Sequence, residues 1–220
     1  MNVVVANSYL DDLNLGTKWL IPYKPFARQD RYTDLGHCCE THLVDRLTPR
    51  NFTFLDLHSV CEDHEDDYKE IGQGEITRAI LRKFGKLTDV KARVLPDHGS
   101  RDKFLTSDSF AENVFCSKSR DAETGKLLWF SIDSEVPQDM PLYIVDDICD
   151  GGGTFIGLAI ELRKKMRSDQ ELNLMVTHGM FTKGIEPLLE HFDHIYTTDS
   201  YRTDLVETER LHVLNIKELL

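Results

Sequence analysis

Short apolar runs alternate with longer amphipathic stretches along most of the chain. The runs have the length and the β-branched or aromatic content of strands, and they occupy residues 17–21, 52–57, 92–95, 113–116, 127–132, 142–145, 172–177, 194–198 and 211–216. Between several of them, apolar residues recur at helical spacing over residues 76–87, 154–166 and 185–192. Alternating strands and helices predict an α/β fold with a mainly parallel sheet covered on both faces. The run 127–132 follows a turn-like AETGK segment and is typical of half a β-hairpin instead.

The composition narrows the class of protein. The chain has 220 residues, of which 40% are hydrophobic and 29% are charged, as is usual for a globular protein with a substantial core. No apolar run approaches the roughly 18 residues of a membrane span, and the N-terminus lacks a signal-peptide pattern. Five cysteines without paired spacing favour reduced thiols and a cytoplasmic location. The net charge of −12 argues against nucleic acid as a partner.

The segment LYIVDDICDGGGT carries the most specific chemistry of the chain. Residues 142–145 predict a buried strand, DDICDGGG predicts a loop, and Thr154 is the expected N-cap of the next helix. In open α/β sheets, ligands bind beyond the carboxyl ends of strands, where helices begin. Glycines 151–153 let backbone amides approach an anion, and the helix dipole favours a phosphate there.

Two adjacent acids precede this predicted phosphate site. The carboxylates of Asp146 and Asp147 can accept hydrogen bonds from vicinal hydroxyls, or hold a Mg²⁺ ion that does so. A turn rich in solvated acids is the alternative, but adjacent acids at the end of an apolar strand rarely arise from packing. A diol site beside a phosphate site predicts binding of ribose 5-phosphate.

The same loop resembles the phosphoribosyl-diphosphate loop of type I phosphoribosyltransferases and ribose-phosphate pyrophosphokinases. By that resemblance, ribose 5-phosphate would be bound by Asp146, Asp147, Asp150, Gly151, Gly152, Gly153 and Thr154. The segment IPYKPFARQDR, residues 21–31, separates the two groups, since it resembles the ATP-binding segment of the pyrophosphokinases alone. The chain is therefore similar to the ribose-phosphate pyrophosphokinase family, and the resemblance implies ATP, ribose 5-phosphate and Mg²⁺ as ligands and a homo-oligomer.

Further motifs occur in the order expected of that family. The resemblance implies that Arg28 and Gln29 contact ATP, and that His58 in LDLHS takes part in catalysis and holds the ATP-bound Mg²⁺. Asp97 in VLPDHGSRDKF would be the second metal-facing residue. CSKSRDAETGK, residues 116–126, resembles the flexible catalytic loop, in which Lys118 and Arg120 would act on the transferred group. VTHGMF, residues 176–181, and the closing HVLNIKELL resemble further family segments.

The chain departs from the family pattern at two places that concern the site. The Phe-x-x-Gly-Glu hairpin that helps to hold adenine has no counterpart, so we expect either a truncation or a shortened homologue with an incomplete N-terminal lobe. Gly151 stands where relatives usually carry threonine, so backbone alone would replace one hydroxyl contact to the 5-phosphate.

The resemblance implies two related lobes and one reaction. We expect an ATP-side lobe of residues 1–70 completed by 210–220, and a phosphoribosyltransferase-like lobe of residues 71–209. The implied reaction transfers the diphosphoryl group of ATP to the 1-hydroxyl of ribose 5-phosphate, giving phosphoribosyl diphosphate and AMP. Two alternatives stay open: a base phosphoribosyltransferase that uses the same loop, and a non-catalytic subunit related to the synthetase.

Overall fold

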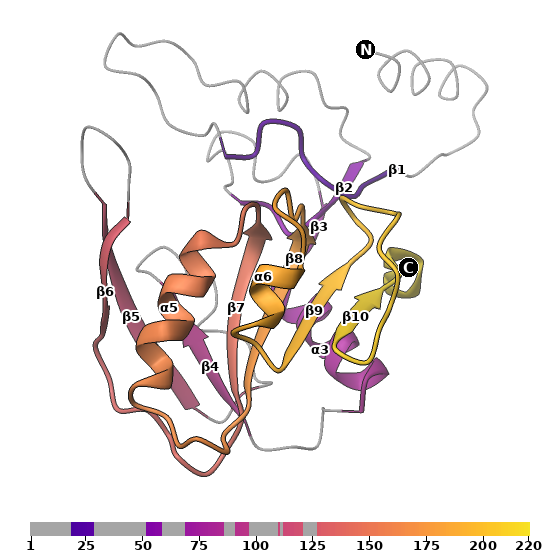
Figure 1. The fold of residues 1–220 in the computed structure, drawn as a ribbon. Helices are drawn as coiled ribbons and strands as arrows, with labels where there is room; N and C mark the ends of the chain where they lie inside the picture. The colour runs from indigo at the N-terminus through magenta and orange to yellow at the C-terminus, as the bar shows by residue number, and fades with distance from the viewer. Residues whose placement is uncertain are drawn as a thin grey trace, which may run out of the picture. The chain divides into compact units, whose positions relative to one another are not determined.

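The computed structural model describes residues 19–28, 52–58, 69–85, 91–96, 110, 112–120 and 127–220 (Figure 1). The chain divides into two compact units, Met1–Gly72 and Gln73–Leu220. The α/β class with mainly parallel sheets, predicted from the alternation of apolar runs, is confirmed. Each unit is described by itself below.

The first unit contains a three-stranded parallel sheet in the order β1-β2-β3. Its strands are β1 (Trp19–Ile21), β2 (Phe52–Leu55) and β3 (Lys69–Ile71). Phe52 and Phe54 alternate into a small apolar cluster, and the ring of Trp19 stacks on Phe52 with centroids 6.0 Å apart. Strand β3 was not predicted, because the sequence KEI carries no apolar run; pairing with β2 places it in the sheet.

The second unit is built on a seven-stranded sheet in the order β10-β9-β8-β7-β4-β5-β6. Its strands are β4 (Ala92–Leu95), β5 (Glu112–Arg120), β6 (Leu127–Ile132), β7 (Leu142–Cys149), β8 (Leu172–Gly179), β9 (His194–Thr198) and β10 (Leu211–Leu214). Every pairing is parallel except that of β5 with β6, which is antiparallel. The hairpin expected from the run 127–132 is thus confirmed.

Helices cover both faces of this sheet. Figure 1 shows α5 (Gly153–Arg163) and the short α6 (Glu186–Leu189) on one face and α3 (Gln73–Lys83) on the other. Helix α5 buries Phe155, Leu158, Ala159 and Leu162 against strand residues that are 0–1% exposed, and so forms the main core. On the other face, Phe84 follows α3 and its ring contacts the rings of Tyr196 and His212.

The C-terminal segment lies in the second unit, so the expectation that residues 210–220 complete the first lobe is wrong. Strand β10 pairs with β9 from Leu211↔Ile195 to Leu214↔Thr198. The 3₁₀ helix η2 (Ile216–Leu219) contacts α3, and the ammonium of Lys83 lies 2.9 Å from a carboxylate oxygen of Glu218. An apolar strand can add to either edge of any open sheet, and its sequence does not say which.

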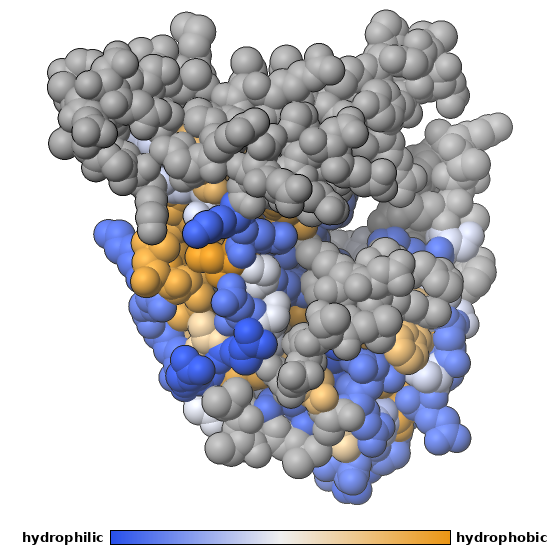
Figure 2. Space-filling model, turned by 180° about the vertical axis from the view of Figure 1, so that it is seen from behind, coloured by the Kyte–Doolittle hydropathy of each residue, from blue (hydrophilic) through white to orange (hydrophobic). Residues whose placement is uncertain are grey.

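The surface on the α3 side of the second unit is mixed in character. Figure 2 shows hydrophilic residues beside a group of hydrophobic ones, where the described residues are visible. No helix among the described residues has the length and apolar content needed to cross a membrane.

Arginine side chains join the elements at the amino-terminal edge of the sheet. Arg163, at the end of α5, donates to Asp193 Oδ2 at 2.8 Å, and the amide of Leu172 donates to the same oxygen at 2.8 Å. Arg210, just before β10, donates to the carbonyls of Asp193 at 3.0 Å and Phe192 at 2.6 Å. Charge-assisted bonds of this kind connect α5, β8, β9 and β10 at one end.

Replacing the carboxylate of this cluster is expected to destabilise the second unit. Burial raises the pKa of Asp193, but the Leu172 amide and the Arg163 guanidinium outweigh it and hold the pKa below its usual value. Because the pKa is depressed, the stabilisation is present above the unfolded pKa of about 3.9 and is lost as pH falls through the folded pKa. Asp193→Asn should lower the free energy of unfolding by about 1 kcal/mol at pH 7 in urea titrations, since the group is partly exposed.

The matched control is Asp204→Asn, which removes the partner of Arg202 in a pair on the surface. That change should leave the urea midpoint within error. Equal effects of the two substitutions, or a loss at Asp193 that persists unchanged at pH 3, would contradict the assignment.

Candidate functional site

The candidate site is built on the carboxyl end of β7, which continues further than the sequence predicted. The strand was expected to stop at Val145, but it runs to Cys149 because β8 offers partners along its whole length, up to Cys149↔Gly179. Asp146 and Asp147 therefore lie within the strand, and the prediction of a loop starting at Asp146 is wrong. A long parallel partner satisfies the backbone whatever the polarity of the side chains.

The two acids of β7 are held in fixed orientations by the backbone beside them. Asp146 Oδ1 accepts from the amide of Asp147 at 3.0 Å, and Asp147 Oδ1 accepts from the amide of Ile148 at 2.8 Å. Asp147 is 5% exposed, whereas Asp146 is half-buried. Both acids therefore lie near the carboxyl end of β7, beside the loop that leads to α5.

The loop after β7 turns directly into α5. Gly152 is the N-cap, with φ of 76°, and the first helical bond runs from the amide of Ile156 to the Gly152 carbonyl at 3.0 Å. Thr154 was expected to be the N-cap; it lies inside the first turn, and no side chain caps the helix. The helix itself supplies no acceptors for the amides of its first turn, which makes this N-terminus a site suited to an anion.

The glycines of the loop have different structural roles. At Gly152 the left-handed φ excludes most other residues, and a Cβ would lie 2.9 Å from Leu188 Cδ2. A Cβ at Gly153 would meet nothing within 4 Å. At Gly151 it would meet the stem of Lys183 at 3.4 Å.

The loop after β8 is bonded to the loop after β7. The amides of Met180 and Phe181 donate to the Cys149 carbonyl at 2.9 and 3.2 Å. Thr182 bonds Asp150 twice, from its amide to the carbonyl at 3.1 Å and from its hydroxyl to Oδ1 at 2.7 Å. The carboxylate of Asp150, expected to bind ribose 5-phosphate, therefore holds this neighbouring loop. Sequence reasoning missed Thr182, which lies 32 positions away.

Buried polar groups fill the carboxyl ends of β8 and β9. His178 is 2% exposed, and its Nδ1 lies 2.7 Å from the Ser200 hydroxyl. The Thr198 hydroxyl donates to the Thr177 carbonyl at 2.8 Å and lies 2.8 Å from Ser200 Oγ. These bonds fix the start of the loop after β8. The polar sequence TTDS after an apolar run was the available signal for this cluster.

Burial makes Cys149, at the end of β7, an unreactive thiol. Desolvation raises its pKa to about 12, the carboxylates of Asp146 and Asp150 add to the rise, and the Gly152 amide offsets part of it. At neutral pH the group is a neutral thiol and not a nucleophile. The chemistry of this end of the sheet therefore rests on carboxylates and amides.

Lys118 lies on a strand, not on the loop predicted for residues 116–126. Strand β5 extends to Arg120 because β6 pairs with it antiparallel, and Lys118 lies opposite Phe130 with a register shift after Ser119. The side chain of Lys118 is half-buried. The Arg120 side chain lies outside the described residues.

Two predicted ATP-side residues belong to the first unit. Arg28 and His58 are exposed and follow β1 and β2, which are parallel neighbours, so both segments leave the same edge of that sheet. The backbone after β2 is held by Leu57, whose amide donates to Glu70 Oε1 at 2.8 Å. Gln29 and Asp97 lie outside the described residues. Within the described part of the chain, no group of three metal-ligating side chains occurs.

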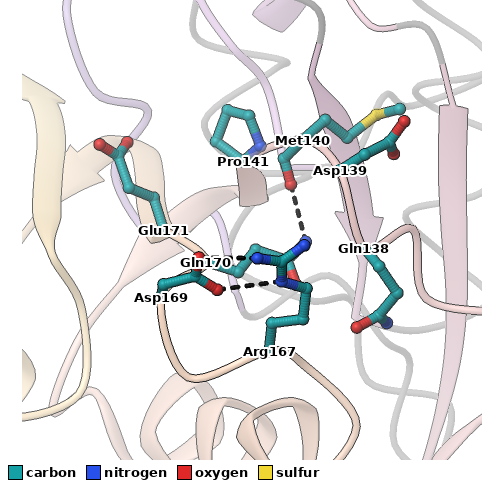
Figure 3. A pocket seen from close by; sticks show the side chains of 8 residues that line it. All are labelled: Gln138, Asp139, Met140, Pro141, Arg167, Asp169, Gln170 and Glu171. Atoms are coloured by element: carbon teal, nitrogen blue, oxygen red, sulfur yellow. Dashed lines mark hydrogen bonds and ion pairs between the residues drawn. The ribbon is translucent and has the colours of Figure 1, made fainter.

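A pocket of about 380 Å³ lies at the opposite, amino-terminal edge of the sheet (Figure 3). In it the Arg167 guanidinium pairs with the Asp169 carboxylate at 2.8 Å. The amide of Gln170 donates to the carbonyls of Met140 at 2.7 Å and Pro137 at 2.6 Å. The Nε2 bonds of Gln170 join the segments before β7 and β8, so we assign Gln170 a structural role in this pocket.

Known proteins resemble the chain in sequence and in fold. A ribose-phosphate pyrophosphokinase of Sulfurisphaera tokodaii is 24% identical over 161 residues, which cover 70% of this chain and 55% of that protein. The crystal structure of phosphoribosylpyrophosphate synthetase from Mycobacterium smegmatis matches with a TM-score of 0.70 and 19% identity, covering 91% of this chain and 67% of that one. The chain is thus similar in sequence to a ribose-phosphate pyrophosphokinase and in fold to a phosphoribosylpyrophosphate synthetase.

No family model matches the chain. The chain spans about half the length of the curated relative, 55%. The structural similarity establishes the phosphoribosyltransferase-type fold that the family resemblance predicted. The roles of the individual site residues stay predictions.

Gly152 should be far less tolerant of a side chain than its neighbour. Gly152→Ala must adopt a left-handed φ and bring its methyl against Leu188, so we expect the free energy of unfolding to fall by about 1–2 kcal/mol. Gly153→Ala is the matched control, because open space surrounds that Cβ and alanine favours the helix. Thermal unfolding that ranks the two variants equally, or in reverse, would contradict this account.

The Cys149 thiol should resist alkylation in the folded protein. With its pKa near 12, almost no thiolate forms at pH 8, and burial blocks access as well. Treatment with iodoacetamide, followed by peptide mapping, should leave Cys149 unmodified before unfolding and label it fully in urea. Rapid labelling of this peptide under native conditions would show that the end of β7 is open.

Proposed function

We propose that the chain binds ribose 5-phosphate at the loop between β7 and α5 and uses it as the acceptor of the diphosphoryl group of ATP, forming phosphoribosyl diphosphate and AMP. The observation that carries the proposal is one juxtaposition. Strand β7 carries two carboxylates near its end. The chain then passes through Gly152, which has a left-handed φ, into the N-terminus of α5, a helix of 11 residues. The names of the relatives in sequence and fold agree with it.

The sugar phosphate would be held by backbone and carboxylate groups acting on its two ends. First-turn amides of α5 and its positive dipole end would receive the 5-phosphate. The oriented carboxylates of Asp146 and Asp147 would accept hydrogen bonds from the ribose hydroxyls. Local donors of this kind can bind an anion in a protein whose net charge is −12.

The transfer step needs positioning and positive charge more than covalent chemistry. The 1-hydroxyl oxygen of the sugar forms a bond to the β-phosphorus of ATP, and the bond from that phosphorus to the oxygen bridging to the α-phosphorus breaks. AMP leaves, and the hydroxyl proton is released. Lys118 on β5, together with Arg120, would stabilise the charge that develops on the moving group.

ATP and its metal ion would be contacted by the residues that the family resemblance indicates. Arg28 and Gln29 would contact the nucleotide, and the exposed His58 could offer a ring nitrogen to an ATP-bound Mg²⁺ ion, together with Asp97. Mg²⁺ is commonly held by substrate phosphates and water with few protein ligands. When bound, the ion would neutralise phosphate charge.

Turnover and binding can be separated by two substitutions. Lys118→Ala should lower the rate of AMP formation from ATP and ribose 5-phosphate about a hundredfold, because its contact matters in the transition state. Its affinity for ribose 5-phosphate should change little. Asp147→Asn, which keeps the shape of a buried residue, should abolish that affinity in calorimetry with Mg²⁺ present.

Lys164→Ala is the control, since this exposed lysine pairs with Glu161 near the other end of α5. Unchanged sugar-phosphate affinity in Asp147→Asn would refute the site. Unchanged turnover in Lys118→Ala would remove the catalytic role of that residue. Tight binding with no AMP formed by the unmodified chain would favour the non-catalytic alternative.

A further inference from the structure

Lys183 lies directly against the loop proposed to hold phosphate. Its Cδ and Cε atoms are 3.4 Å, and its Cγ atom 3.7 Å, from the point where a Cβ on Gly151 would be. The aliphatic stem therefore packs over the backbone of Gly151, and the ammonium is one bond beyond Cε. A Cβ at position 151 would be in van der Waals contact with this stem.

The backbone on both sides of Lys183 is fixed, so its position follows from the fold. Thr182 is held to Asp150 by two hydrogen bonds. On the other side, the Gly184 amide donates to the Phe181 carbonyl at 2.9 Å, with Gly184 at φ of 80°. The Phe181 ring is 2% exposed and packs over Gly179. This tight turn carries the lysine to the loop at Gly151.

The ammonium of Lys183 has no protein partner among the residues that the structure describes, although the chain is strongly acidic. Other exposed cations of this unit do pair: Lys164 with Glu161, and Arg167 with Asp169. The acid next to the turn, Asp150, gives its Oδ1 to Thr182 instead.

We propose that Lys183 is a ligand of the phosphate bound at residues 151–154. Its ammonium would add a point charge to a cradle that otherwise consists of backbone amides and the helix dipole. The inference rests on the proposed function, in which this loop takes the 5-phosphate of a sugar. Lys183 would select a phosphorylated sugar over the free sugar, and it would supply a side-chain contact where Gly151 has none.

Binding measurements with two probes test the role of Lys183. Lys183→Met keeps most of the stem and removes the charge, so calorimetry should show about a tenfold weaker affinity for ribose 5-phosphate. Lys183→Arg should recover most of the loss. Lys183→Met should also weaken the affinity for inorganic phosphate, the second probe. The matched control Lys164→Met should change neither affinity. Both lysines are exposed, so the substitutions should leave the fold intact, and circular dichroism checks this.

A second substitution tests the packing of Lys183 on Gly151. Gly151→Ala puts a methyl in contact with the lysine stem, 3.4 Å from Cδ and Cε, and a shift of the stem away from that methyl should weaken ribose 5-phosphate binding in the unmodified background. Gly151→Ala should reduce the affinity for ribose 5-phosphate less in the Lys183→Met background, because that background has no ammonium to displace. Independent effects of the two substitutions would show that the stem does not position the charge.

The outcomes separate this inference from the proposed function. Equal affinity for ribose 5-phosphate in Lys183→Met and the unmodified chain overturns the role of Lys183 and leaves the function standing. A chain that binds phosphate through Lys183 but does not bind ribose 5-phosphate supports the inference and overturns the function. A chain that binds neither probe overturns both.

Discussion

The pairing of β7 with β8 is the constraint on which the candidate site depends. The two strands run in parallel register from Leu142↔Leu172 to Cys149↔Gly179, at the centre of the seven-stranded sheet. Parallel neighbours end at the same edge, so the chain leaves both strands side by side. The loop at Asp150 and the loop at Thr182 can therefore bond each other. Without that register, the carboxylates, the N-terminus of α5 and Lys183 would have no common location.

Much of the fold could be predicted because apolar runs report burial. The strands at 92–95, 127–132 and 194–198 coincide with the predicted runs. The extensions of β7 and β5 could not be predicted in this way. Asp146 and Lys118 are polar, and local polarity favours a loop, but a neighbouring strand that continues supplies the missing hydrogen bonds. A strand ends where its partner ends, and no single segment of sequence contains that information.

Part of the candidate site could likewise be predicted from the sequence, and part could not. The acids and glycines of residues 146–153 could be identified from the sequence because they are adjacent and chemically distinct. The contacts of Thr182 and Ser200 could not be predicted from the sequence, since each depends on two segments that meet at a sheet edge. The placement of β10 failed for a related reason: the run 211–216 shows that a strand exists, but not which edge receives it.

The arginine cluster around Asp193 has a consequence for how such a protein can diverge. It fastens α5, β8, β9 and β10 at the amino-terminal edge of the sheet, far along the strands from the loops that follow β7 and β8. Residues that hold the architecture and residues that would meet a ligand thus sit at opposite ends of the same strands. Drift at the ligand end can alter which small molecule is chosen while the framework stays intact. Substitutions at the ligand end can therefore change ligand specificity without first lowering the stability of the fold.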